Sequence, residues 1–333
     1  MLTQITKEVF SFPIELPDTP LKSLNSYVIR PSDGGRCLLI DTGFHHPRCW
    51  EALCAGMREA GLEPENTDVF LTHAHADHTG NASALVQLGC RMFISRPDYA
   101  MYTSWLSGDF DTMAELSELE GMPKDLVARL LLEAPVMHYT SPYFPATLLE
   151  DGDELCYGSY RLRCIVTPGH TPGHMCLYDE NQELLFLGDH VLFDITPNIT
   201  GWGKGRDALR LYLESLRQIA RLPVSIALPA HRSLGSITLA KRVDQLIAHH
   251  RRRLEEALAV LREGERFTAY EVAAQLRWRI RANSWEEFPL RQKWFALGEA
   301  LAHLEYLCDI GAAQSTVIDG VRYYFTCDDG LDL

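Results

Sequence analysis

The sequence lacks the features that mark secreted proteins, membrane proteins and serine hydrolases. Its nine cysteines are an odd number with no Cys-x-x-Cys pair, which excludes a disulfide scaffold and a zinc ribbon. No run of about 18 apolar residues occurs, and the first residues lack the basic and apolar regions of a signal peptide. No Gly-x-Ser-x-Gly motif is present. We therefore expect a cytoplasmic protein with reduced thiols and no membrane partner.

Positive charge is also scarce. The chain has 31 Lys and Arg against 45 Asp and Glu, a net charge of −14, which argues against a nucleic acid as its main partner. Residues 232–281 are an exception, with 11 basic against 6 acidic side chains and a run of three arginines at Arg251, Arg252 and Arg253. A solvated helix face explains this run more simply than a binding surface does.

The length indicates more than one domain. A chain of 333 residues is longer than the roughly 250–300 residues at which a single hydrophobic core stops growing. Hydrophobic residues make up 46% and charged residues 23% of the chain, as in ordinary globular proteins. We predict a large domain over residues 1–235 and a small one over residues 236–333.

Alternating short strands and helices are predicted for the larger domain. A hairpin pairs residues 27–30 with 37–40, and a helix over residues 49–60 ends at Gly61. A helical insertion is predicted within residues 97–150. The other expected elements are strands at 68–72, 91–95, 154–157, 160–167, 175–178, 184–187 and 225–228 and helices at 81–88 and 207–220.

The smaller domain is predicted to be mostly helical. The expected elements are helices at 238–262, 269–276 and 288–310 and a final hairpin of residues 316–318 and 321–325. Three helices and a hairpin resemble a winged-helix unit. The spacing of Leu297, Leu301 and Leu304 indicates that the last helix packs inward or against a second subunit, so a homodimer is one expectation.

A dense group of metal-binding side chains follows the strand at 68–72. Residues Thr72 to His78 read Thr-His-Ala-His-Ala-Asp-His. In an extended segment His73 and His75 face the same side and can bind one ion. Asp77 and His78 come after the turn and can face a second ion. A single histidine is more often a hydrogen-bonded core residue, but four ligand side chains in six positions indicate a metal site, with zinc as a suitable ion.

Three further segments share one design, a β-prone run that ends in a polar residue. They end at His170, Asp189 and His231. Residues at strand ends are held rigidly and can converge across the edge of a sheet, as a preformed metal site requires.

With these motifs in this order, residues 24–232 resemble the metallo-β-lactamase superfamily. The resemblance rests on Asp41-Thr42-Gly43, the His73–His78 cluster, His170, Asp189 and His231. It implies an α+β fold, a four-layer αββα sandwich, here with the helical insertion and the winged-helix-like domain.

The resemblance also implies a role for each side chain. One metal ion would be bound by His73, His75 and His170, and the other by Asp77, His78 and His231. Asp189 would bridge the two ions. Asp41 would orient a ligand, although an aspartate that merely forms a turn is the alternative, and His174 would pack or hydrogen-bond rather than bind metal.

The implied reaction is hydrolysis. Two divalent ions, zinc with iron or manganese as alternatives, would share a hydroxide that attacks an acyl carbon, and Asp77 would aim that hydroxide. Residues 167–174 read Thr-Pro-Gly-His-Thr-Pro-Gly-His and are similar to the hydroxyacylglutathione hydrolase (glyoxalase II) branch and to related lactonases. The expected substrate is a small acyl molecule, a thioester or a lactone.

Two rival functions follow from the carboxyl-terminal part. Basic groups that bind glutathione in glyoxalase II have no recognisable match there, whereas a winged-helix-like unit follows the hydrolase domain in some superfamily members, including one that cleaves RNA. An endoribonuclease is therefore the alternative hydrolase. A winged-helix nucleic-acid-binding module with a purely structural metal is the third reading, although seven ligands are more than one closed zinc site uses.

Overall fold

The computed structural model describes residues 1–108, 110–133, 139–201, 207–262, 266–278, 282 and 284–326. The chain forms two compact units. The first unit consists of Met1–Ser107, Pro135–Pro197 and Ser215–Arg242, and the second of Gly108–Ala134, Asn198–Glu214 and Val243–Leu333. Both units are discontinuous in the sequence, whereas the sequence analysis predicts one boundary after residue 235.

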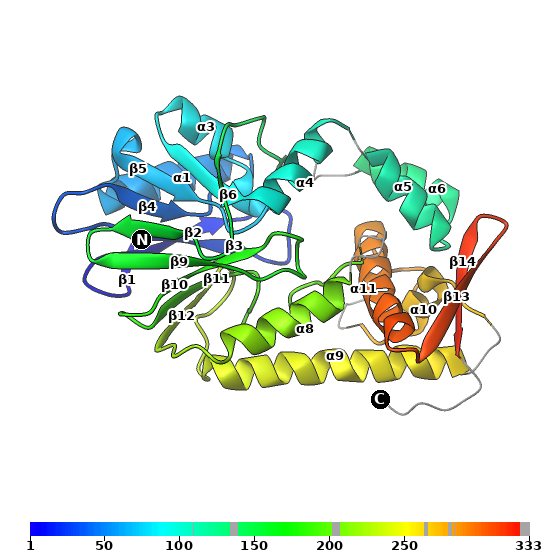
Figure 1. Cartoon of the computed structure of the whole chain (residues 1–333). Helices are drawn as coiled ribbons and strands as arrows, with labels where there is room; N and C mark the ends of the chain where they lie inside the picture. Colours follow the sequence, from blue (N-terminus) through cyan, green and yellow to red (C-terminus); the bar gives the residue numbers. More distant parts are fainter. Residues whose placement is uncertain are drawn as a thin grey trace. The chain divides into compact units, whose positions relative to one another are not determined.

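A seven-stranded sheet forms half of the first unit (Figure 1). Its strands follow the order of the chain: β1 Thr3–Gln4, β2 Val9–Glu15, β3 Ser23–Ile29, β4 Cys37–Ile40, β5 Thr67–Phe70, β6 Arg91–Ser95 and β7 Thr147–Leu149. Neighbours are antiparallel from β1 to β4 and parallel from β4 to β7. The helices between the parallel strands supply the crossovers that such strands require.

A five-stranded sheet forms the other half of this unit. In spatial order its strands are β12 Ile226–Pro229, β11 Leu184–Gly188, β10 Met175–Asp179, β9 Tyr160–Val166 and β8 Glu154–Tyr157. Strand β10 is antiparallel to both β9 and β11, and β12 is parallel to β11. The carboxyl ends of β9, β11 and β12 therefore lie at the same edge of the sheet.

The two sheets pack face to face and helices cover their outer faces, which gives the αββα sandwich predicted from the sequence. Side chains such as Ile29 and Phe186 form the core between the sheets. A second core between the first sheet and its helices contains Phe12 and Leu53. The helices are α1 Pro47–Ala60, η1 Pro64–Asn66, α2 Ala76–Thr79, α3 Ala82–Gln87 and α4 Arg96–Leu106.

Helix α8, Ala208–Ile219, spans the boundary between the two units. Its last turns belong to the first unit, where the Ser215 hydroxyl donates a hydrogen bond of 3.1 Å to the Pro168 carbonyl beyond the end of β9. These turns contribute to the helical layer on the second sheet.

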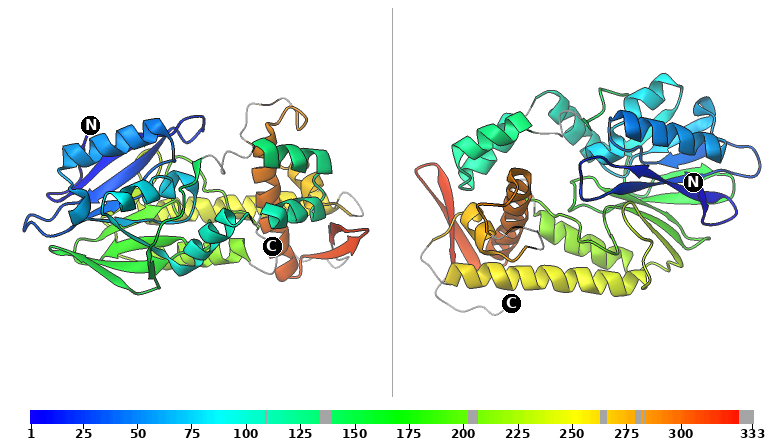
Figure 2. Two further views of the ribbon diagram at one scale, coloured as in Figure 1. Left: turned by 90° about the horizontal axis from the view of Figure 1, so that it is seen from above. Right: turned by 180° about the vertical axis from the view of Figure 1, so that it is seen from behind.

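The second unit is built from helices and one hairpin (Figure 2). Its elements are α5 Phe110–Leu119, α6 Lys124–Glu133, α9 Leu239–Arg262, of which the first residues belong to the first unit, α10 Ala269–Gln275, α11 Leu290–Asp309, β13 Ala313–Ile318 and β14 Val321–Thr326. Asp319 and Gly320 form the hairpin turn with φ of 50° and 81°, as expected for an Asp-Gly turn. The helices and the hairpin match the sequence prediction, while their assignment as a winged helix stays a prediction.

Neither a disulfide nor a membrane-spanning helix is found in the described part of the chain. Its eight cysteines are free thiols, and Cys327 lies outside the described residues. Among the described helices, none combines the length and the apolar character needed to cross a bilayer.

Candidate metal centre

The His73–His78 cluster lies at the carboxyl end of β5. The strand ends at Phe70, and the extended residues that follow it carry His73 and His75. His75 is the N-cap of the four-residue helix α2, so the chain turns between His75 and Asp77. The turn separates the cluster into two pairs, as the sequence pattern predicts.

The other three candidate ligands come from the second sheet. His170 follows β9, Asp189 directly follows β11, and His231 follows β12. Because these strand ends share one edge, the structure brings all three side chains to the His73–His78 cluster. The ligand atoms fall into groups whose members lie within 4.8 Å of one another: His73, His75 and His170; Asp77, His78 and His231; and His73, His78 and Asp189.

Distances within the first two groups suit small divalent cations. In the first group, His73 Nε2 lies 2.9 Å from His75 Nδ1. In the second, His231 Nε2 lies 3.2 Å and His78 Nε2 3.7 Å from Asp77 Oδ2. Ligands at about 2.0–2.2 Å from a tetrahedral zinc ion are about 3.3–3.6 Å apart. The two distances in the second group are close to this spacing, whereas the two nitrogens of the first group are nearer together and would move apart around an ion.

Asp189 lies between the two groups. Its Oδ2 is 3.6 Å from Nε2 of His170 in the first group. Its Oδ1 is 3.7 Å from Nε2 of His78 and 3.4 Å from Nε2 of His231 in the second. One carboxylate thus presents one oxygen to each group, the arrangement needed to bridge two cations.

Hydrogen bonds fix the tautomers of two histidines in the second group. The Nδ1–H of His78 donates to Asp41 Oδ2 at 2.8 Å, and that of His231 donates to the Ser23 carbonyl at 2.9 Å. Each Nε2 then faces the centre, where it can give its lone pair to a cation that displaces any proton. Neither Nε2 of His78 nor Oδ1 of Asp189 has a hydrogen-bond partner among the described residues. A cation at the centre would satisfy these buried atoms.

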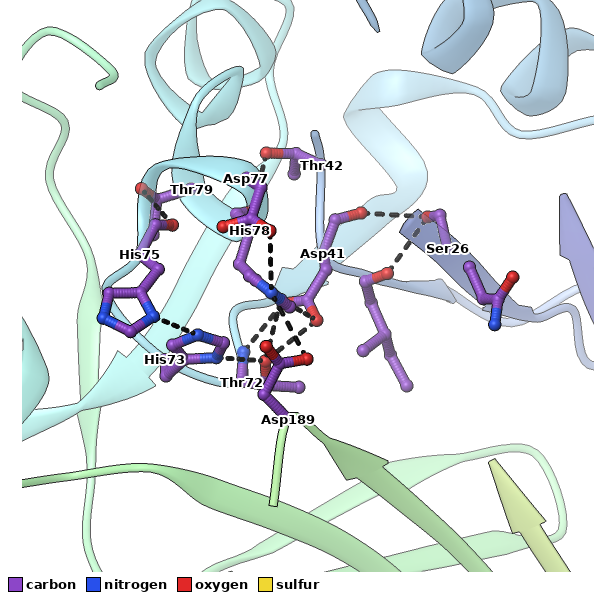
Figure 3. A network of polar contacts seen from close by, with 12 residues as sticks. Ser26, Asp41, Thr42, Thr72, His73, His75, Asp77, His78, Thr79 and Asp189 are labelled. Atoms are coloured by element: carbon purple, nitrogen blue, oxygen red, sulfur yellow. Dashed lines mark hydrogen bonds and ion pairs between the residues drawn. The ribbon is translucent and has the colours of Figure 1, made fainter. Parts of the chain in front are cut away.

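Asp41 orients more than one part of the site (Figure 3). It is buried, and its φ of 60° places a non-glycine residue in the left-handed region. Besides His78, it accepts hydrogen bonds from the backbone N–H and the hydroxyl of Thr72 at 2.9 and 2.8 Å. The Thr72 hydroxyl also lies 3.1 Å from Nδ1 of His73. Sequence reasoning missed Thr72, although its position beside the cluster is a signal.

His174 lies behind Asp189 and belongs to none of the three ligand groups. Its Nε2 accepts a hydrogen bond of 3.1 Å from the backbone N–H of Asp189. Its Nδ1–H donates to the hydroxyl of Thr167 at 2.8 Å. His174 therefore holds the backbone that carries the Asp189 carboxylate.

The electrostatic environment differs between the two groups. Burial and the neighbouring imidazoles hold the pKa of His73 and His75 well below the usual range, so both are neutral and able to bind a cation. Burial also opposes the charged form of His78, but Asp41, Asp77 and Asp189 outweigh it and raise the pKa of His78 to about 10. The carboxylates thus favour positive charge at the second group.

Some of the candidate ligands keep a small exposure to solvent. His73, His78 and His231 are fully buried, whereas the side chains of Asp77 and Asp189 are 11% and 9% exposed and His75 is partly exposed. A catalytic metal site keeps one position accessible to water, whereas a structural site is closed.

Comparisons with known proteins agree with this geometry. A family model of the metallo-beta-lactamase superfamily matches residues 20–231. Two similar proteins from Aspergillus fumigatus are the lactamase-like protein nscB, 28% identical over 74% of this chain, and an atrochrysone carboxyl ACP thioesterase, 26% identical over 74% of this chain. The chain spans about three fifths of the length of these relatives, 59% and 62%.

A solved structure is similar over almost the whole chain. A metallo-beta-lactamase family protein from Thermus thermophilus is 28% identical, with a TM-score of 0.82. The alignment covers 97% of this chain and 100% of that protein.

Proposed function

Because the chain belongs to the metallo-beta-lactamase superfamily, we propose that it is a binuclear metal-dependent hydrolase that cleaves a thioester. The observation that carries the proposal is the position of Asp189. Its two carboxylate oxygens lie at opposite ligand groups, 3.6 Å from His170 Nε2 and 3.4 Å from His231 Nε2. A purely structural site needs one closed set of four ligands and no such bridge.

Each group of ligands would hold one ion. His73, His75 and His170 would bind the first, Asp77, His78 and His231 the second, and Asp189 both. Zinc fits this set of imidazole and carboxylate donors, and iron and manganese are alternatives. When bound, two such ions lower the pKa of a water molecule and polarise the acyl oxygen of a substrate.

The chain's own residues would position the nucleophile. The Asp77 side chain keeps a small exposure to solvent and can accept a hydrogen bond from the attacking water, which directs the water oxygen toward the acyl carbon. The new C–O bond forms, the C–S bond breaks, and the sulfur leaves as a thiol after taking up the water's proton. Asp41 and the Ser23 carbonyl keep His78 and His231 oriented throughout.

Two observations support a thioester as the bond that is cleaved. The similar protein from Aspergillus fumigatus is a thioesterase that acts on an acyl carrier protein by its printed name. The Thr167–His174 segment resembles that of hydroxyacylglutathione hydrolases. We propose a small acyl thioester as the substrate, with a lactone as the second choice because related lactonases share this segment.

The second unit gives little support to a nuclease. Of its three consecutive arginines, Arg253 is buried, pairs with Glu256 and Glu299 at 3.1 Å, and lies over the Trp278 ring. Arg251 pairs with Glu255. Two of the three arginines therefore pair with glutamates of the same unit, and the buried Arg253 is not accessible to phosphates.

Steady-state hydrolysis by the metal-loaded protein tests the proposal. The panel contains S-lactoylglutathione, an acyl-CoA, a homoserine lactone and a fluorogenic single-stranded RNA. We expect turnover of a thioester, reduced more than about 100-fold in His75→Ala because the first group loses a ligand. His45→Ala, at an exposed position, is the matched control and should keep wild-type turnover. Cleavage of RNA alone, or full turnover by His75→Ala, would contradict the proposal.

A further inference from the structure

A buried carboxylate outside the ligand segments contacts both loops of the first ligand group. Asp98 lies in the first turn of α4 and is fully buried. It belongs to none of the ligand groups, and no motif in the sequence marks it. The three hydrogen bonds that its carboxylate accepts come from residues outside its own helix.

Each oxygen of Asp98 accepts hydrogen bonds from the loops that carry histidines. Oδ2 accepts from the backbone N–H of Ala74 at 2.8 Å and from the Thr171 hydroxyl at 2.7 Å. Oδ1 accepts from the backbone N–H of Gly173 at 2.6 Å. Ala74 stands between His73 and His75, and Thr171 follows His170.

These contacts connect two segments that come from different sheets. The first loop follows β5 of the seven-stranded sheet, and the second follows β9 of the five-stranded sheet. Nothing in the sequence ties their relative position, yet the first ligand group needs His170 at a fixed distance from His73 and His75. A buried carboxylate with three short hydrogen bonds is a rigid connection, since breaking any one of them leaves a buried polar group unsatisfied.

The packing around Gly173 shows how closely the second loop approaches α4. A Cβ atom at this position would lie 2.4 Å from the Ser95 hydroxyl and 2.8 Å from Asp98 Oδ1. Only glycine permits the loop to come this near to the start of the helix. The absence of a side chain at Gly173 therefore allows its backbone N–H to reach the Asp98 carboxylate.

We infer that Asp98 is a positioning residue that sets the distance between His170 and the His73–His75 pair and thereby the affinity of the first group for its ion. The inference rests on the proposed function, because it requires both groups to bind metal. The second group, Asp77, His78 and His231, is oriented by Asp41 and Ser23 instead and should not depend on Asp98.

The experiment compares metal binding by Asp98→Asn and by a matched control. The amide keeps the shape of the side chain but turns an NH₂ group toward at least one N–H or O–H donor. Asp179→Asn is the control, because Asp179 is also fully buried and accepts two backbone N–H bonds, from Arg161 and Gln182. Stoichiometry by native mass spectrometry and chelator competition with zinc report each site without any substrate.

We expect wild type and Asp179→Asn to bind two ions, and Asp98→Asn to bind one ion with unchanged affinity and the other about 10- to 100-fold more weakly. Thr171→Val removes a single donor and should weaken the binding of the same ion to a smaller extent. This variant tests the inference even if Asp98→Asn does not fold.

Three results would overturn the inference. If Asp98→Asn and Thr171→Val both bind two ions with wild-type affinity, Asp98 does not determine the metal affinity of the first group. If Asp98→Asn and Asp179→Asn lose metal affinity to the same extent, the loss reflects a general destabilisation of the fold and not the position of Asp98. If the wild-type protein binds fewer than two ions, the proposed function itself is overturned. The stoichiometry of the wild-type protein is therefore measured before that of any variant.

Discussion

At the scale of single residues, Asp41 is the clearest support of the second ligand group. It accepts the Nδ1–H of His78 and two hydrogen bonds from Thr72, although its φ of 60° is costly for an aspartate. A strained, buried and fully bonded carboxylate next to a metal ligand is a position where the surrounding structure imposes a conformation for function.

We predict that Asp41→Asn lowers the affinity of one metal ion by about 10- to 100-fold. The amide has a single oxygen, so it cannot accept both the Thr72 backbone N–H, which bonds Oδ1, and the His78 Nδ1–H, which bonds Oδ2. One of these bonds is replaced by a contact between two donors, which disturbs the support of His78. Isothermal titration with zinc measures the change. Asp33→Asn, in an exposed turn, should titrate like wild type, and an Asp41→Asn protein that does the same would refute the role of Asp41.

The candidate ligands could be predicted from the sequence because they stand in recognisable motifs. The residues that orient them could be predicted only in part. Asp41 lies in an Asp-Thr-Gly motif, but Ser23 acts through its backbone carbonyl, which leaves no side-chain signal. Asp98 and Thr72 act through hydrogen bonds to Thr171 and Asp41, which form only once separate segments have folded together.

At the scale of helices and strands, periodicity predicted most elements within a few residues. Helix α1 shows why, because its buried stripe ends at Gly61, whose φ of 69° favours glycine. Strand β2, Val9–Glu15, was not predicted. It contains Pro13, which usually excludes a strand, but Pro13 is exposed in this strand and stands opposite Asn25.

Helices α9 and α11 of the second unit meet at two buried histidines. His250 Nδ1 lies 3.1 Å from His303 Nε2, and the Nδ1–H of His303 donates to the Glu299 carbonyl at 2.7 Å. His303 Nε2 is therefore an acceptor, and His250 supplies the proton. Burial lowers the pKa of His303 to about 3, and burial together with His303 holds that of His250 well below its usual range.

This pair predicts a loss of stability in acid. Both histidines titrate near about 6.5 in the unfolded chain, so the unfolded state binds more protons than the folded one below that pH. Above it the pair has no effect. As pH falls from about 6.5 toward 3, the free energy of unfolding should drop by up to about 1.4 kcal/mol per pH unit for each histidine.

Urea unfolding of the metal-loaded protein at several values of pH measures whether the free energy of unfolding falls in acid. His303→Gln, which cannot take up a proton, should have a shallower decline below about pH 6.5 than wild type. His45→Gln, at an exposed position, should follow the wild-type curve. Parallel curves for wild type and His303→Gln would exclude the pair as a source of acid sensitivity.

At the scale of the whole molecule, the division into units is the feature that the sequence revealed least. Length and composition indicate two units, but Gly108–Ala134 and Asn198–Glu214 belong to the second unit although they precede residue 235. Membership of a unit is decided by contacts between distant segments. Composition along the chain carries no record of such contacts.

Net charge leads to a prediction about partners. With a charge of −14 and with Arg253 paired to Glu299, the protein should bind single-stranded RNA weakly. The double variant Arg251→Gln/Arg252→Gln should keep thioester turnover within about twofold of wild type. Fluorescence anisotropy with labelled RNA over a range of salt concentrations measures binding. Arg221→Gln, exposed in the first unit, is the control.

A nuclease would behave differently. Tight, salt-sensitive RNA binding by wild type, with a shallower salt dependence in the double variant alone, would assign the two arginines to phosphate contacts. That outcome would favour RNA over a small acyl molecule as the partner of this chain.

If the protein binds metal as proposed, the spacing of the seven candidate ligands along the chain also affects how the apoprotein would acquire its ions. His73, His75, Asp77 and His78 are near neighbours in sequence, so a denatured chain can chelate zinc through them at little cost in loop-closure entropy. His170, Asp189 and His231 become available only when the two sheets have assembled. Zinc bound early would nucleate the turn between β5 and α2, and because it also binds the denatured chain, it would stabilise the folded protein less than its native affinity alone implies.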